Sequence, residues 1–90
     1  MIKVDISQFG SSLVSRPAGR EAALALQANM LRSAPEKELI EIDFSNVLVL
    51  TPSWADEFFA VLKEQWGDRI KITPTTNPSV ELTLKTIGIS

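Results

Sequence analysis

The stretch DFSNVLVLTPSWADEFFAVL, from Asp43 to Leu62, decides the fold. Its apolar, β-branched run up to Leu50 is typical of a strand, and the Thr51-Pro52-Ser53 that follows is typical of a helix start. Beyond that start, apolar residues recur at helical spacing and form one stripe of Ala55, Phe58, Phe59, Leu62 and Trp66. The stretch therefore predicts a central strand that leads through a buried turn into a helix packed on a core.

Strands and helices are predicted to alternate through the rest of the chain. Strands are expected at Ile2 to Ile6, Leu39 to Phe44 and Arg69 to Thr73, with a short further strand between Ser7 and Ser15. Helices are expected at Ala18 to Ser33, Pro52 to Gly67 and Asn77 to Gly88. This order predicts an α/β fold in one domain, residues 1–90, with a mixed β-sheet and three main helices packed on one face. The expected core includes Ile42, Phe44, Phe58, Phe59 and Leu62.

Composition narrows the classes of function. The 90 residues contain no cysteine and no histidine, which excludes disulfides and thiolate zinc sites and removes the commonest metal ligand and general base. A net charge of −2 gives no basic footprint for nucleic acid, so we expect none as a partner. The N-terminus reads as a strand rather than a signal peptide, and no apolar run approaches the length of a membrane span. We expect a cytoplasmic protein that is not an enzyme and holds no metal or cofactor.

Thr51-Pro52-Ser53 has a structural interpretation as a helix start. Thr51 can cap the helix, and Pro52 suits its first position. The carboxylates of Asp56 and Glu57 are favourable near the positive end of the helix dipole. The cap and these charges together stabilise the helix by about 1 to 2 kcal/mol. Ser53 with Asp56 also has the spacing of a capping box. The alternative is that one of these hydroxyls is modified or acts as a site.

A second group of candidates surrounds the first helix start. If the strands run parallel, the starts at Arg16-Pro17, Thr51-Pro52-Ser53 and Asn77-Pro78-Ser79 collect at one end of the sheet, where α/β sheets bind ligands. Arg16 and Arg20 beside free helix amides suit a phosphate or carboxylate. The alternative is that Arg16 pairs internally with Asp56 or Asp43, which fixes two helix starts against each other.

The carboxylates Asp43, Asp56 and Glu57 would also suit a magnesium ion or acid–base catalysis. No histidine or activated nucleophile accompanies them, and the helix dipole already explains two of the three, so catalysis is not predicted. Trp54 lies about 100° from the centre of the apolar stripe, and we expect it to reach the surface and contact a partner. Trp66 lies within the stripe and is expected in the core.

Asp43-Phe44-Ser45-Asn46-Val47, followed by a short apolar run and a serine at a helix start, resembles the STAS fold of bacterial anti-sigma-factor antagonists. In that family a partner kinase phosphorylates the second hydroxyl residue at this helix start. By this resemblance Asp43 matches the strand-end aspartate and Ser53 the phosphoacceptor. Thr51 and Trp54 depart from the pattern, because the family has an acidic residue and a glycine there.

A closer resemblance extends over most of the chain. The segments FGSSLVSRPAGREA, IDFSNVLVLTPSWADEFF and NPSVELTLKTI look like the signature segments and last helix of the STAS-like domain family of unknown function. This resemblance implies a small, non-enzymatic regulatory module, partnered with a histidine-kinase-like ATPase or a transcriptional regulator.

We therefore expect protein binding through the surface around Ser53, Trp54 and the first helix start. The alternative is a small-anion or nucleotide sensor that uses Arg16 and Arg20, and a third class is an accessory subunit with a structural role. The oligomeric state stays open.

Overall fold

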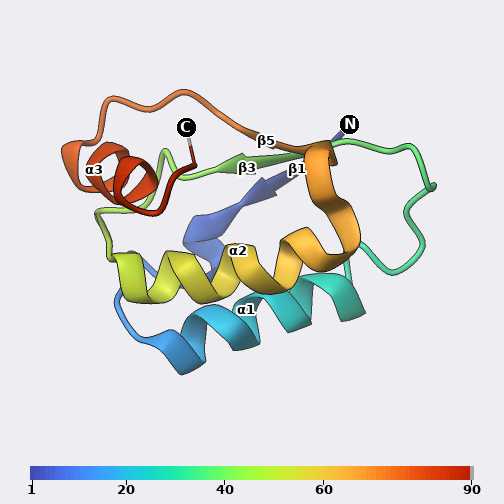
Figure 1. Cartoon of the computed structure of the whole chain (residues 1–90), viewed down its shortest axis with the longest axis horizontal. Coiled ribbons are helices and arrows are strands. Elements are labelled where there is room, and N and C mark those ends of the chain that lie inside the picture. Colours follow the sequence, from blue (N-terminus) through green and yellow to red (C-terminus); the bar gives the residue numbers. More distant parts are fainter. Residues whose placement is uncertain (90) are drawn as a thin grey trace.

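The computed structural model describes residues 1–89, and strands and helices alternate through them (Figure 1). The strands are β1 (Ile2–Asp5), β2 (Ser12–Leu13), β3 (Ile40–Asp43), β4 (Val49–Leu50) and β5 (Ile70–Ile72). The helices are α1 (Arg16–Ala28), α2 (Pro52–Trp66) and α3 (Pro78–Thr86), with 3-10 turns η1 (Ile6–Phe9) and η2 (Gly67–Arg69). The predicted α/β class with three main helices is confirmed, and so is the short strand expected between Ser7 and Ser15.

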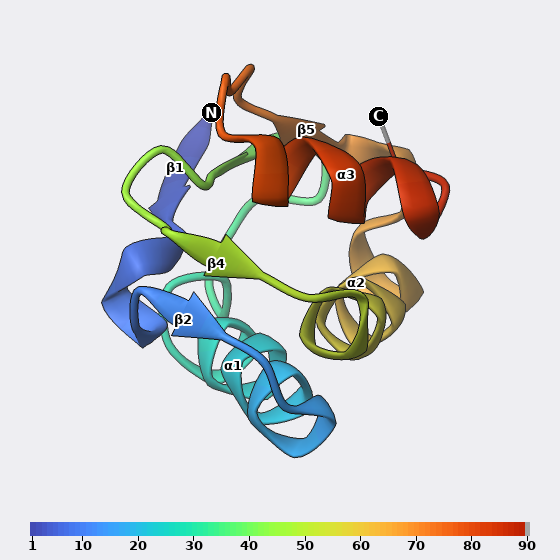
Figure 2. The same cartoon turned by 90° about the vertical axis from the view of Figure 1, so that its left-hand side faces the viewer.

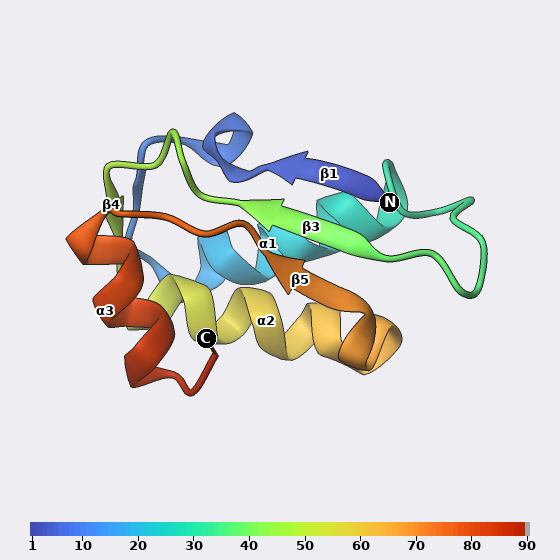
Figure 3. The ribbon, with the colours of Figure 1, turned by 90° about the horizontal axis from the view of Figure 1, so that it is seen from above.

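All strand pairs in residues 1–89 are parallel. One sheet has the order β1-β3-β5, and β2 pairs with β4 as a separate two-stranded unit (Figures 2 and 3). The mixed sheet that the sequence led us to expect therefore contains no antiparallel pair in this part of the chain. The physical reason is connectivity, since a helix separates the two strands of every pair and a hairpin never forms.

Two helices cover one face of the three-stranded sheet. Helices α1 and α2 lie side by side beneath it, whereas α3 lies at the carboxyl end of the strands, against β4 and α2 (Figures 1 and 2). The buried strand residues alternate with polar ones, as period two requires. On the outer face Lys3, Glu41 and Lys71 stand in one register row, and Lys3 Nζ lies 3.7 Å from Glu41 Oε1. The sheet thus has one apolar and one charged face.

The aromatic core is the one predicted from the stripe. Ile42, Phe44, Phe58, Phe59 and Leu62 are all buried, and so is Trp66. The Phe58 and Phe59 rings meet edge to face, with centroids 5.2 Å apart, and Phe59 contacts the Phe44 ring at 6.2 Å. These contacts join α2 to the segment that follows β3.

Helix α1 has boundaries that differ from the predicted Ala18 to Ser33. It begins at Arg16, because Ser15 is the N-cap and its Oγ accepts a hydrogen bond from the Ala18 N–H (3.2 Å). It ends at Ala28, where the chain turns so that the Leu31 N–H donates to the Leu26 C=O (2.9 Å). The turn buries Leu31 in the core, and burial of this side chain outweighs continuation of the helix.

Candidate functional site

The three helix starts meet at the carboxyl end of the sheet (Figure 1). Thr51, the N-cap of α2, bonds to the end of β2 and to the residue after it, because its N–H donates to the Leu13 C=O (3.0 Å) and its hydroxyl lies 3.1 Å from the Val14 C=O. Ser79 in the first turn of α3 accepts a hydrogen bond from the Leu50 N–H (3.1 Å). The end of β4 is thus tied to the starts of two helices and to β2.

The cap of α2 is Thr51, as predicted. Its Oγ1 accepts a hydrogen bond from the Trp54 N–H (3.5 Å). The capping box expected between Ser53 and Asp56 is not formed within residues 1–89, because Ser53 lies inside the helix and Thr51 holds the capping position. The Ser53 side chain is half-buried in the first turn of α2, and its hydroxyl makes no hydrogen bond to any other described residue.

Arg16 crosses from α1 to the start of α2, as predicted. Its Nη1 lies 3.5 Å from Asp56 Oδ2 and 3.7 Å from Glu57 Oε1. The Arg16 and Asp56 side chains are 55 % and 60 % exposed, so water screens the pair and its contribution to stability is small. Arg20, the other arginine of the predicted anion site, is exposed and forms no ion pair with another residue in the described range.

Trp54 is buried, with only 1 % of its surface exposed, so the expectation that it reaches the surface was wrong. Its ring stacks on Phe58 at a centroid distance of 4.8 Å. The flank of α2 that carries Trp54 is covered by α1, which approaches so closely that a Cβ on Gly19 would lie 2.2 Å from the Trp54 carbonyl oxygen. A second helix therefore widens the buried face of α2 beyond the stripe that faces the sheet. Trp54 is a core residue and not a partner contact.

Asp43 does not join Asp56 and Glu57 in a hydrogen-bonded or ion-paired cluster. Its Oδ1 accepts hydrogen bonds from the Ser45 N–H (2.8 Å) and the Ser45 hydroxyl, an arrangement that ends β3. Asp5 ends β1 in the same way, with the Ser7 N–H at 2.9 Å and the Ser7 hydroxyl at 2.7 Å. The bonds from Ser7 hold the pKa of Asp5 below its usual value. Asp43 therefore has a structural role at this strand end.

Four exposed apolar side chains at the carboxyl end were missed by sequence reasoning. They are Val14 after β2, Leu48 and Val49 at β4, and Leu82 on α3. Figure 2 shows these three elements on the face that carries the helix starts. The alternation of β4 contained a signal, because Leu50 points into the core and Val49 must then point outward. We call these four side chains the carboxyl-end patch.

Charged side chains lie at the start of α2, at the same end of the molecule as the carboxyl-end patch. Leu48 is 68 % exposed and Leu82 is 67 % exposed. Arg16, Asp56 and Glu57 lie at the adjacent helix start. No group of three or more acidic side chains able to hold a metal ion occurs in residues 1–89. This end of the molecule therefore carries both exposed apolar and charged side chains.

A family model described as the STAS-like domain of unknown function (DUF4325) matches residues 23–80. The match extends from the middle of α1 to the start of α3 and includes Asp43, Thr51 and Ser53, whereas Arg16 and Arg20 precede it. No curated protein and no solved structure gives a match. Among the described helices, none has both the length and the hydrophobicity to cross a bilayer. Because the model matches more than half of the chain, the protein belongs to this family of STAS-like domains.

Proposed function

We propose that the protein is a non-enzymatic regulatory module that binds a protein partner through the carboxyl-end patch and the start of α2. The observation that carries this proposal is the exposure of Val14, Leu48, Val49 and Leu82 at one end of the molecule. Exposed apolar side chains that gather beside a polar rim mark interaction surfaces in soluble domains. The patch takes the place of Trp54, which is buried, as the apolar centre of this surface.

Family resemblance supports the kind of partner. STAS-like modules resemble anti-sigma-factor antagonists, so a histidine-kinase-like ATPase or a transcriptional regulator in the cytoplasm of a bacterium is the partner that we propose. The absence of histidine and cysteine from the sequence, together with the structural roles of Asp43 and Thr51, supports a module without catalysis.

Ser53 is the residue at which we propose regulation by phosphorylation. Its half-buried side chain lies in the first turn of α2, where free amides and the helix dipole favour negative charge. A phosphate there would compete with Asp56 and Glu57 for the Arg16 guanidinium, and those two carboxylates would repel it. The modification would thus rearrange charges on the binding surface while Thr51 continues to cap the helix.

The experiment is a capture assay with matched variants. Leu48→Asp and Leu82→Asp place charges in the carboxyl-end patch, and Leu24→Asp places the same charge on an exposed leucine of α1 as the control. A protein captured by the wild type is identified, purified and tested for direct binding. We expect the two patch variants to weaken that binding by at least about tenfold, as loss of a central apolar contact does. Equal binding by Leu48→Asp and Leu24→Asp would refute the patch as the binding surface.

Regulation at Ser53 has a separate test. Ser53→Asp and Ser53→Ala are compared for binding to the same purified partner and for thermal stability. We expect a difference in binding with similar stability, because Ser53 does not cap α2. If the two variants bind equally well, Ser53 is only a helix residue, and the carboxyl-end patch remains under test through the leucine variants.

The alternative, a small-anion or nucleotide sensor based on Arg16 and Arg20, is less well supported. Two carboxylates already lie within 4 Å of the Arg16 guanidinium, so an anion would have to displace both. A ligand that binds only the folded protein raises its melting temperature. A reproducible rise in melting temperature with phosphate or a nucleotide that is lost in the Arg20→Ala variant would favour the sensor over the protein-binding module.

A further inference from the structure

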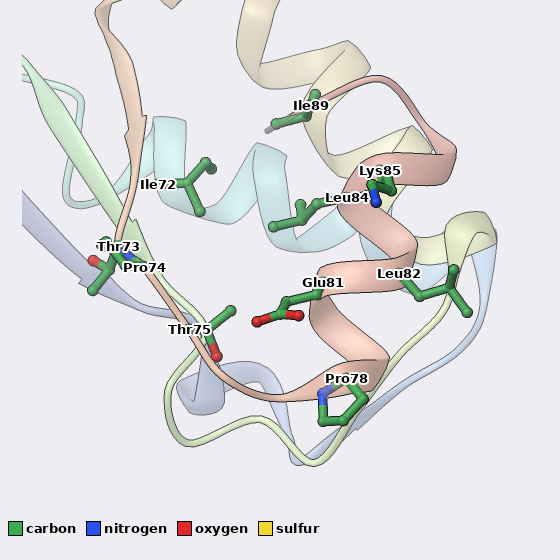
Figure 4. Close-up of a pocket in the computed structure, with 10 residues that line it drawn as sticks. All are labelled: Ile72, Thr73, Pro74, Thr75, Pro78, Glu81, Leu82, Leu84, Lys85 and Ile89. Atoms are coloured by element: carbon green, nitrogen blue, oxygen red, sulfur yellow. The ribbon is translucent and has the colours of Figure 1, made fainter.

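A groove runs along β5 beside α3, and Leu82 of the carboxyl-end patch is among the residues that line it. Its larger part is a hollow of about 620 Å³ between α3 and the segment that leads from β5 to it (Figure 4). Ile72, Pro74, Leu84 and Ile89 line this part with apolar atoms. A smaller hollow of about 440 Å³ shares Ile72 and Ile89 and continues toward the end of α2. The two hollows follow the edge strand from one end to the other.

The backbone of β5 faces this groove with unpaired groups. β5 is an edge strand of the order β1-β3-β5, and the Thr73 N–H donates to the Ile42 C=O at 2.9 Å. Because backbone groups alternate in direction along a strand, the N–H and C=O of Ile72 point away from β3. Within residues 1–89 they make no hydrogen bond to another residue. An open edge of this kind is a template for a further strand.

We propose that the groove binds an extended peptide segment of another protein, which adds a strand to β5. An extended backbone can satisfy both the N–H and the C=O of Ile72, and its alternate side chains can enter the apolar hollow. A compact apolar ligand would fill the hollow and leave the strand edge unpaired. This site shares Leu82 with the carboxyl-end patch, but it rests on the backbone of Ile72 and does not depend on the proposed function.

Charge at the two ends of the groove specifies the peptide further. Lys63 and Lys71 line the smaller hollow together with Asp68, and neither lysine pairs with an acidic side chain within 4 Å in the described residues. In the larger hollow Glu81 and Lys85 balance each other, and Figure 4 shows the Glu81 carboxylate directed into the space. The end nearest α2 is therefore locally cationic in a protein of net charge −2. A peptide with a carboxylate at that end and an apolar residue next to Ile72 fits the groove.

The test is an NMR titration of the full chain, labelled with nitrogen-15, with acetylated and amidated pentapeptides. Members of the panel alternate valine or leucine with threonine and begin with aspartate or, as a charge control, with lysine. A second control carries N-methyl groups on the residues that would pair with β5, which removes the donors and keeps the side chains. We expect shifts at Ile70, Ile72 and Leu84, and slower exchange of the Ile72 amide proton.

Quantitatively, N-methylation is expected to weaken binding by about tenfold, because it removes backbone hydrogen bonds. Aspartate-led peptides are expected to bind about two- to fivefold more tightly than lysine-led ones, and Lys71→Glu is expected to abolish that preference. Lys3→Glu, on the other edge strand, is the matched control and keeps the preference.

The proposal is overturned if no member of the panel shifts the β5 resonances. Equal binding by the N-methylated control would overturn it in favour of a simple apolar pocket. Protection of the Ile72 amide that rises with protein concentration in the absence of peptide would overturn it in favour of pairing between two copies of this chain.

Discussion

The packing of α1 against α2 differs from the packing of α3 against the rest of the molecule. Where α1 meets α2, Gly19 lets the backbones approach, and Trp54 of α2 is buried there and stacks on Phe58 of the same helix. α3 packs Val80 and Leu84 into the core and is tied in addition by hydroxyl groups, since Ser79 and Thr83 both bond to the backbone of Leu50. A hollow of about 620 Å³ remains beside it.

The difference teaches which part of the molecule is a scaffold and which part is open to ligands. A close apolar contact excludes water and has one favoured arrangement, because protein interiors pack densely. A helix that packs only part of its length on the core, as α3 does through Val80 and Leu84, leaves neighbouring backbone and apolar surface exposed. The two proposed binding surfaces, the carboxyl-end patch and the groove along β5, accordingly both adjoin α3 and share Leu82.

The largest expected effect tests the scaffold at Trp54. Trp54→Ala removes the largest of the buried side chains and the stacking contact with Phe58. We expect the free energy of unfolding to fall by about 3 to 5 kcal/mol, as for other large aromatic truncations in cores. Urea unfolding followed by circular dichroism measures it. A change below 1 kcal/mol, the usual range for an exposed residue, would mean that Trp54 lies at the surface after all.

The next effect concerns the close approach at Gly19. Gly19→Ala puts a Cβ 2.2 Å from a backbone oxygen of α2, and we expect a loss of about 1 to 3 kcal/mol from overpacking. The direction of the change in stability is informative, because Gly→Ala at a helix position with free space stabilises a protein by about 1 kcal/mol. Urea unfolding of Gly19→Ala beside Gly19→Ser gives the comparison. A stabilised Gly19→Ala variant would show that the helices are further apart.

A smaller effect tests how α3 is held. Thr83→Val keeps the shape of a buried side chain but removes the hydroxyl that donates to the Leu50 C=O. We expect a loss of about 1 kcal/mol, the cost of one buried hydrogen bond. Thr86→Val is the matched control, because the Thr86 hydroxyl is exposed and bonds only within its own helix, to the Leu82 C=O. Equal unfolding midpoints for the two variants would show that the hydroxyl of Thr83 does not anchor α3.

The smallest effect is expected at Arg16. Arg16→Ala breaks an exposed pair with Asp56 and Glu57, and we expect a loss of no more than about 1 kcal/mol at low salt. Because salt screens exposed charges, the loss is expected to vanish near 1 M sodium chloride. Thermal unfolding at low and high salt measures it, with Arg20→Ala as the control. A loss that persists at high salt would mean that Arg16 contributes through packing.

Much of the fold could be predicted because its signals are local. Strand alternation at Ile40 and Ile42, and the helical stripe through Phe58 and Leu62, depend on neighbours in the sequence and are confirmed. The approach of Arg16 to Asp56 followed from the rule that helix starts in a parallel sheet share one end.

What could not be predicted depends on contacts between distant elements. Trp54 is buried because α1 covers a second side of α2, and a helical wheel of α2 alone contains nothing about α1. The end of α1 depends on Leu31 reaching the core. The exposure of Leu48 and Leu82 depends on where β4 and α3 meet, so only Val49 of the carboxyl-end patch could be predicted from the periodicity of a single element.

The parallel pairing of every strand has a consequence for how fast the chain can fold. Ile2 pairs with Ile40, and Ile40 pairs with Ile70, so each pairing requires closure of a long loop that contains a helix. No hairpin can form first and reduce that entropic cost. The transition state must therefore assemble distant segments together, and we expect refolding to be slower than that of a helical bundle of equal length. Stopped-flow refolding measures this rate. A rate as fast as that of a helical bundle of equal length would contradict a transition state in which distant segments assemble together.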